Sequence, residues 1–189
     1  MSQTRVSAIV GFGTLVVITL AFALWGLNPF QSRPSWVPTC SDLTVAMQAD
    51  AGGAWSVSKP DPDRKINETS TLCEVAFTSG DQRYSGTVGV RVGGDADEDA
   101  AQRTAEIGDC PGLPYPTPKP PGYSVLRACN AVIGERLSSA LEAAKGKRTV
   151  SLSLHTSIPA DVAASDAAVF AQETMAKLAD LGLTVPESG

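Results

Sequence analysis

Apolar and polar positions alternate most regularly in two neighbouring segments, residues 72–78 and 83–92. The apolar positions are Val75 and Phe77 in the first segment and Val88, Val90 and Val92 in the second. A period of two is typical of a strand with one buried face. Ser79-Gly80-Asp81, between the segments, has the residue types that tight turns use. The pattern therefore predicts a β-hairpin.

Two further segments, residues 54–58 and 149–157, alternate in the same way and predict strands. The second has an apolar face and a polar face. The apolar face holds Val150, Leu152 and Leu154, and the polar face holds Ser151, Ser153 and His155. We expect the apolar face to pack on the core.

Three segments combine helical spacing with signals for helix ends. Residues 41–50 begin with Ser41-Asp42 and are followed by a glycine pair. Residues 95–107 open with acidic side chains, which interact favourably with the positive end of a helix. The last helix is expected to have Ser165 as its cap and to end at Gly182.

Residues 131–145 fit two structures. Leu137, Leu141 and Ala144 suit a helix that ends at Gly146. Leu137, Leu141 and Ala143 also suit a strand that pairs with the next one across a short turn. Because Ala, Glu, Lys and Leu favour helices, we predict a helix.

The remaining segments are predicted to be loops. Residues 58–70 and 111–121 are polar and contain several prolines, and residues 28–39 form a proline-containing spacer. The order of elements predicts an α+β fold for residues 40–183, with a short tail at 184–189. We expect an antiparallel sheet covered by two to four helices.

An uncharged apolar segment, residues 6–27, precedes the spacer. Its 22 residues make a helix of about 33 Å, enough to cross a hydrocarbon core of about 30 Å. A cleaved signal peptide is the alternative, since Ala21-Phe22-Ala23 resembles a cleavage site, but the apolar run continues beyond it. We expect an uncleaved transmembrane anchor, with residues 1–5 in the cytoplasm.

The cysteines indicate the side of the membrane. Cys40, Cys73, Cys110 and Cys129 all follow the apolar segment, and none belongs to a C-x-x-C pair. Two disulfides are the expected use, and these persist in an oxidising compartment, so residues 40–183 are predicted to be extracytoplasmic. Of three possible connectivities we favour Cys40 with Cys73 and Cys110 with Cys129. The first pair links a helix start to the hairpin it covers, and the second closes the proline-rich loop.

The charge excludes some partners. The chain has a formal net charge of -5, which becomes -6 after the anchor because Arg5 is the one charged residue before Asn28. An acidic domain without a basic stripe is a poor ligand for nucleic acid and for an anionic lipid surface.

The segments Ser41-Asp42-Leu43-Thr44 and Leu72-Cys73-Glu74-Val75, with a final strand at 149–156 and helix at 166–182, carry a resemblance. The chain resembles a broad group of small actinobacterial extracytoplasmic domains, anchored by a membrane helix or a lipid. Some of these are sensor domains of receptor kinases. The resemblance implies a membrane-anchored domain and transfers no functional residue.

One acidic cluster has the spacing of a calcium loop. Asp95, Asp97, Asp99 and Glu106 occupy positions 1, 3, 5 and 12 of an EF-hand pattern. Position 6, which requires glycine, is Ala100, and the preceding segment is a predicted strand. We therefore expect an acidic first helical turn, with a calcium site as the alternative.

His155 is the single histidine, so any Ser–His or His–metal mechanism would need it. No Gly-x-Ser-x-Gly elbow accompanies it, and we expect no catalytic residue and no cofactor. The sequence thus predicts a non-enzymatic extracytoplasmic domain that binds or senses a protein partner or small ligand. The alternative is a cell-surface hydrolase using His155, or a calcium-dependent domain using the Asp95 cluster.

Overall fold

The computed structural model describes residues 37–50, 52–58, 65–67, 70–110, 112–115 and 118–184, with 65–67 described in the backbone alone. The predicted anchor at 6–27, the residues before it, most of the spacer at 28–39 and residues 185–189 lie outside this part. Within the described ranges, no helix combines the length and apolar character that a membrane crossing requires.

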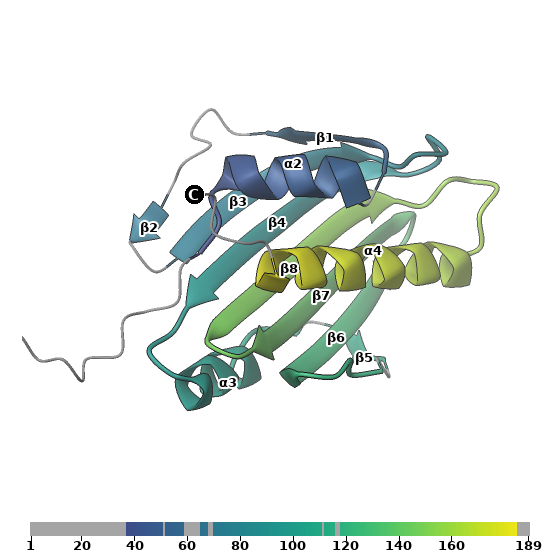
Figure 1. Ribbon diagram of the computed structural model, residues 1–189. Coiled ribbons are helices and arrows are strands. Elements are labelled where there is room, and N and C mark those ends of the chain that lie inside the picture. The colour runs from purple at the N-terminus through teal and green to yellow at the C-terminus, as the bar shows by residue number, and fades with distance from the viewer. Residues whose placement is uncertain are drawn as a thin grey trace, which may run out of the picture. The chain divides into compact units, whose positions relative to one another are not determined.

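An antiparallel sheet and three helices make up the described part, so the predicted α+β class is confirmed (Figure 1). The strands are β1 (Ala54–Val57), β2 (Lys65–Asn67), β3 (Ser70–Thr78), β4 (Ser85–Gly94), β5 (Leu113–Pro114), β6 (Tyr123–Ile133), β7 (Arg136–Lys145) and β8 (Arg148–Ser157). The helices are α2 (Cys40–Asp50), α3 (Glu98–Glu106) and α4 (Ala164–Thr184).

The strands follow the order β1-β3-β4-β8-β7-β6-β5, and β2 also pairs with β3. The predicted hairpin is present as β3 and β4, with Val75 opposite Val88. The last strand in the chain, β8, lies between β4 and β7 and joins the two halves of the sheet. The expected strands at 54–58 and 149–157 correspond to β1 and β8.

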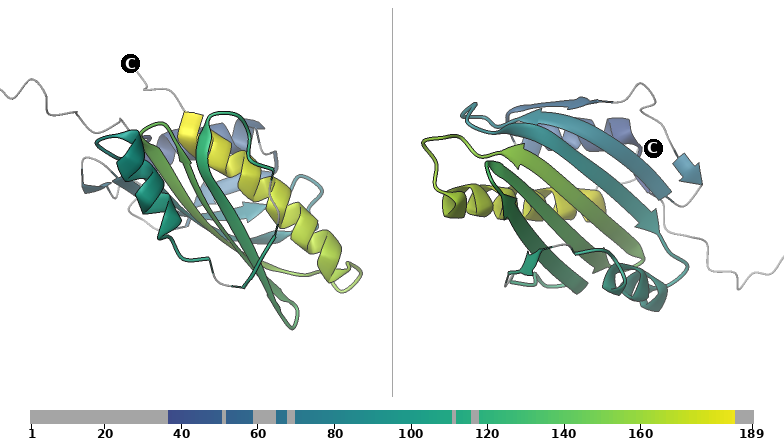
Figure 2. Two further views of the ribbon diagram at one scale, coloured as in Figure 1. Left: turned by 90° about the horizontal axis from the view of Figure 1, so that it is seen from below. Right: turned by 180° about the vertical axis from the view of Figure 1, so that it is seen from behind.

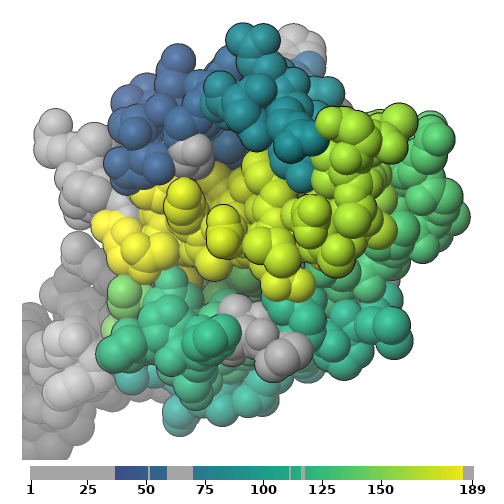
Figure 3. Space-filling model, turned by 90° about the vertical axis from the view of Figure 1, so that its right-hand side faces the viewer, coloured from purple at the N-terminus to yellow at the C-terminus, as the bar shows by residue number. Residues whose placement is uncertain are grey.

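Helices α2 and α4 cover one face of the sheet, and α3 lies on the opposite face near one end (Figures 1 and 2). Figure 3 shows α4 in yellow beside α2 in blue. The alternating apolar positions of β3, β4 and β8 point toward α2 and α4 and form the main core. At one end of this core, the ring of Phe170 stacks on Tyr84, with centroids 4.0 Å apart.

Both predicted disulfides are present, Cys40 with Cys73 and Cys110 with Cys129. The first fixes the start of α2 to β3. A second interaction fixes the same helix end, because the Asp42 carboxylate accepts hydrogen bonds from the backbone N–H and the hydroxyl of Thr39, at 2.9 and 2.7 Å. These contacts explain why the Ser41-Asp42 segment begins a helix.

The predicted helix at 131–145 is wrong, because most of this segment is the strand β7. Its residues from Ser139 to Ala144 are all buried, since α3 packs on one face of β7 and α4 on the other (Figure 2). Small alanines fit this double coverage and remove the apolar–polar alternation that identifies a strand. Tertiary packing thus overrides the helix propensity of Ala, Leu and Glu.

Strand β6 was not expected from the sequence. A bulge between Tyr123 and Val125 turns these two side chains to opposite faces. The Tyr123 hydroxyl donates a 3.0 Å hydrogen bond to Asp180 of α4, while Val125 packs beneath α3 on Ala144. The bulge therefore interrupts the apolar–polar alternation by which a strand is recognised in the sequence.

Four smaller expectations also change. The loop predicted at 58–70 contains β2, and the proline-rich loop at 111–121 contains the two-residue strand β5. Ser165 lies inside the first turn of α4 and does not cap it. Gly182 does not end α4 but lies buried within it, against Val150 of β8.

Candidate functional site

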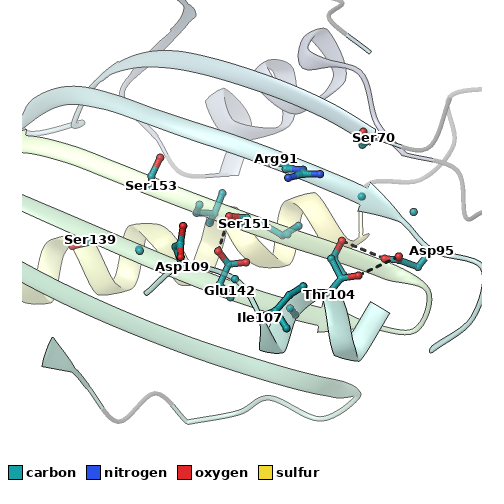
Figure 4. A pocket seen from close by; sticks show the side chains of 18 of the residues that line it. Ser70, Arg91, Asp95, Thr104, Ile107, Asp109, Ser139, Glu142, Ser151 and Ser153 are labelled. Carbon is teal, nitrogen blue, oxygen red and sulfur yellow. Dashed lines mark hydrogen bonds between the residues drawn. The ribbon is translucent and has the colours of Figure 1, made fainter. Parts of the chain in front are cut away.

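A groove of about 670 Å³ lies on the sheet face opposite α2 and α4. Its floor is formed by β4, β8 and β7, and one wall by the end of α3 and the segment that follows it (Figure 4). We call it the open-face groove. Its polar lining includes Arg91, Asp109, Glu142, Ser151, Ser153 and His155.

Strand register places the charged groups of the groove in one row. Arg91 of β4 lies opposite Ser151 of β8, which lies opposite Glu142 of β7. Glu142 in turn lies opposite Arg127 of β6. Side chains at such positions share one face of the sheet, so two arginines flank a serine and a glutamate.

Glu142 lies at the base of the groove and is only 6% exposed. The hydroxyl of Ser151 donates a 2.7 Å hydrogen bond to its Oε1 (Figure 4). Gly108 covers the carboxyl from the other side, since a Cβ on this glycine would lie 2.3 Å from Cδ of Glu142. A side chain larger than hydrogen at residue 108 would displace the carboxyl or the end of α3.

Burial raises the pKa of Glu142 to about 7. The Ser151 hydrogen bond and the positive charges of Arg127 and Arg91 oppose this shift, whereas the negative charge of Asp109 adds to it. The carboxyl therefore changes its charge near neutral pH.

Helix α3 is held firmly over this end of the sheet. Ala101 and Ala105 are buried against Val125 and Ala144. At its start, Asp97 caps the helix by accepting a 2.7 Å hydrogen bond from the N–H of Ala100. At its end, Nη1 of Arg127 donates to the carbonyl oxygen of Glu106. This last contact turns the Arg127 guanidinium toward the helix end.

Small side chains give the groove its room. In the next row along the floor, Gly89, Ser153 and Ala140 lie opposite one another on β4, β8 and β7. A Cβ on Gly89 would lie 2.6 Å from Oγ of Ser153. In this row the groove floor therefore carries only short side chains, beside the longer side chains of Arg91 and Glu142.

The structure does not gather the four acidic residues of the calcium loop that was the alternative to an acidic helical turn. Asp97 caps α3, Glu106 accepts a 2.7 Å hydrogen bond from Gln102, and Asp95 accepts a 3.3 Å bond from Thr104. Asp99 lies exposed in the first turn of α3. Among the described residues, no group of three or more His, Cys, Asp or Glu side chains is placed to hold a metal ion.

His155 lines the groove but is exposed, two residues from Ser153 on the same face of β8. It lies opposite Thr87 of β4 and Ser138 of β7. The polar face expected for β8 is therefore present and forms part of the groove floor.

Arg91 and Glu142 were not among the site residues predicted from the sequence. Glu142 lies in a segment that was predicted to be a helix, and a helix there does not predict that Glu142 lies next to Ser151. The rejected strand alternative contained the necessary signal, because a short turn at residues 146–147 pairs Glu142 with Ser151 directly.

The fold and groove together define an α+β domain with one helix-covered sheet face and one face that carries a polar groove. No family model matches the chain, and neither a curated protein nor a solved structure shows significant similarity to it. The resemblance to actinobacterial membrane-anchored domains therefore stays a prediction.

Proposed function

We propose that this protein is a single-pass membrane-anchored, extracytoplasmic module that binds a small ligand in the open-face groove without converting it. The observation that carries the proposal is the nearly buried carboxyl of Glu142 at the base of a groove rimmed by polar side chains. Concave sites with a few convergent polar groups and a group of shifted pKa are typical of ligand sites.

The proposed location rests on two features. Two disulfides are compatible with an oxidising compartment. The apolar segment at residues 6–27 is long enough to cross a membrane and precedes every cysteine. Together they support a tethered domain that samples ligands outside the cytoplasm.

A hydrolase is the second candidate, because Ser153 and His155 line the same groove. A serine nucleophile requires a base within hydrogen-bond reach and a third group that orients this base. Within the described part of the chain, neither His155 nor Ser153 has a side-chain hydrogen bond of this kind. Binding without turnover is therefore the simpler proposal.

The experiment is a thermal-shift and NMR screen of the full chain, purified in detergent, against a library of small polar metabolites. We expect at least one class to bind and Ser153→Trp, which fills the groove, to abolish that binding. Ser157→Trp is the matched control, because Ser157 lies on the same face of β8 outside the groove. Binding that survives in Ser153→Trp would refute the site.

The rival function is tested on the same material with generic esters, glycans and peptides. Turnover that is present in the unmodified chain and lost in His155→Ala would refute binding without conversion and support the hydrolase.

A further inference from the structure

We infer that the open-face groove binds a small zwitterion, a molecule with a protonated amine and a carboxylate. The amine contacts Glu142 and Asp109, and the carboxylate contacts the guanidinium of Arg91. This inference rests on the proposed function and specifies the chemistry of its ligand.

The amine subsite follows from two carboxylates that share one cavity. Glu142 is nearly buried, and Asp109 lines the groove close enough for its charge to act on Glu142. Among the described residues, neither carboxylate has a lysine or arginine nitrogen within 4.0 Å. Arg127 is the neighbour of Glu142 on β6, but it donates to the carbonyl of Glu106. A ligand cation would supply the direct ion-pair partner that both carboxylates lack among these residues.

The carboxylate subsite follows from Arg91. Its side chain is exposed in the groove, and in the described part of the chain it forms no hydrogen bond or ion pair. An unpaired guanidinium presents a planar fork that matches a carboxylate in two parallel hydrogen bonds. Arg91 would also disfavour a ligand that carries positive charge alone.

The spacing fits a small molecule. Arg91 and Glu142 lie in one row on β4 and β7, with Ser151 of β8 between them, so their backbones are about 10 Å apart. A ligand that contacts both side chains must therefore be short, and the Ser151 hydroxyl, which donates to Glu142, lies between them (Figure 4).

Two other ligand classes fit less well. A divalent cation prefers six or more oxygen ligands, and the described residues contain no cluster of three acidic side chains at the groove. Among the described residues that line the groove, none is Trp, Tyr or Phe, so a flat apolar or sugar ring finds no large aromatic ring on which to stack.

The test titrates the full chain in detergent at neutral pH by isothermal calorimetry with matched probes. L-Alanine is the short zwitterion, and ethylamine and propionate are its two halves. The longer zwitterion is 4-aminobutyrate, with butylamine and butyrate as its halves. We expect at least one zwitterion to bind at least about tenfold more tightly than either of its halves.

Two variants assign the subsites. Glu142→Gln is expected to weaken the zwitterion and the amine about 10- to 100-fold and to leave the carboxylate probe unchanged. Arg91→Gln is expected to weaken the zwitterion and the carboxylate and to spare the amine. Exposed residues at the β6–β7 turn give controls of the same charge change, Glu135→Gln and Arg136→Gln, which should bind like the unmodified chain. Circular dichroism of each variant confirms that it is folded.

If neither zwitterion binds better than its halves, or if Glu142→Gln folds and binds the amine as before, the inference is wrong. A different ligand class that binds in the groove, and is lost in Ser153→Trp, would overturn this inference and leave the proposed function intact. A chain that binds no ligand in the groove overturns both.

Discussion

The carboxyl of Glu142 links the groove to the stability of the domain. Its ordinary pKa of 4.5 is raised to about 7 in the folded chain by burial between Ser151 and Gly108. Below pH 4.5 both folded and unfolded chains hold the proton, so the shift has no effect. Between pH 4.5 and 7 the unfolded chain releases its proton first, and stability falls as pH rises. Above pH 7 the full cost is present, at most about 3 kcal/mol.

Glu142→Gln should therefore stabilise the domain more at pH 8 than at pH 5. The neutral amide still accepts the Ser151 hydrogen bond and avoids the cost of a buried charge. We expect the free energy of unfolding, relative to the unmodified chain, to rise by about 1 to 3 kcal/mol between these two pH values. Urea unfolding at each pH measures it. The charged groups facing Glu142 are Arg91 on β4, Arg127 on β6 and Asp109 after α3.

Glu135→Gln is the control, because Glu135 is exposed and lies outside the groove. Its difference from the unmodified chain should be the same at pH 5 and pH 8. An equal difference at both pH values for Glu142→Gln as well would show that Glu142 is not buried as described.

Gly182 is a second position where the addition of one carbon atom is expected to change the stability of the domain. A Cβ there would lie 2.8 Å from Cγ2 of Val150 and 3.4 Å from Cγ2 of Val92. Alanine would gain about 1 kcal/mol of helix propensity, but overpacking typically costs about 1 to 3 kcal/mol. We expect Gly182→Ala to lower the free energy of unfolding by up to about 2 kcal/mol, measured in urea.

Gly80→Ala gives a comparison with the same chemical change. Its Cβ would lie 3.7 Å from the nearest atom, the amide nitrogen of Gly53, which is ordinary contact. Its stability should stay within about 0.5 kcal/mol of the unmodified chain. A Gly182→Ala variant that is as stable as Gly80→Ala would show that α4 can move away from β8.

At the scale of elements, the sequence predicted those with one buried face and missed those with two. Strands β3 and β4 alternate because helices cover only one of their faces, and β8 keeps the pattern at Ser153, His155 and Ser157, which are exposed although α3 also contacts this strand. Strand β7 does not, because α3 and α4 enclose it, and its alanines then resemble a helix. The bulge of β6 removes alternation in another way. The groove was missed for the same reason, since it needs β7 as a strand to bring Glu142 beside Ser151.

The disulfides act at this scale, because each joins two neighbouring elements. Their closed loops span 33 and 19 positions, for which the chain-entropy model suggests roughly 3 to 4 kcal/mol each. We expect Cys40→Ala/Cys73→Ala to lower the melting temperature more than Cys110→Ala/Cys129→Ala. The reason is that Cys40 and Cys73 are buried and hold α2 on the core.

Calorimetry of both double variants under non-reducing conditions measures this order. Reduction of the unmodified chain should lower the melting temperature at least as much as Cys110→Ala/Cys129→Ala does. An unchanged melting temperature in Cys40→Ala/Cys73→Ala would mean that packing alone holds α2.

For the whole molecule, the proposed anchor and the disulfides predict one topology. A reporter that works only outside the cytoplasm should be active when fused after residue 189. N-terminal analysis of the membrane-bound protein should find residues 1–23 retained, because the apolar run continues past Ala23. A protein that begins near Leu24 would instead indicate a cleaved signal, and an inactive reporter would place the domain in the cytoplasm.

The place of β8 in the sheet has a consequence for how the chain reaches this fold. Its pairing with β4 joins Gly94 to Arg148 and Gly86 to Thr156, contacts 54 and 70 positions apart. Local hairpins close at a lower entropic cost, so we expect β3–β4 and β6–β7–β8 to form as separate halves before β8 pairs with β4. Until β8 pairs with β4 and joins the two halves, the valine-rich edge of β4 is unpaired, and such edges recruit other chains. The strand that completes the sheet is therefore also the one that ends its exposure to aggregation.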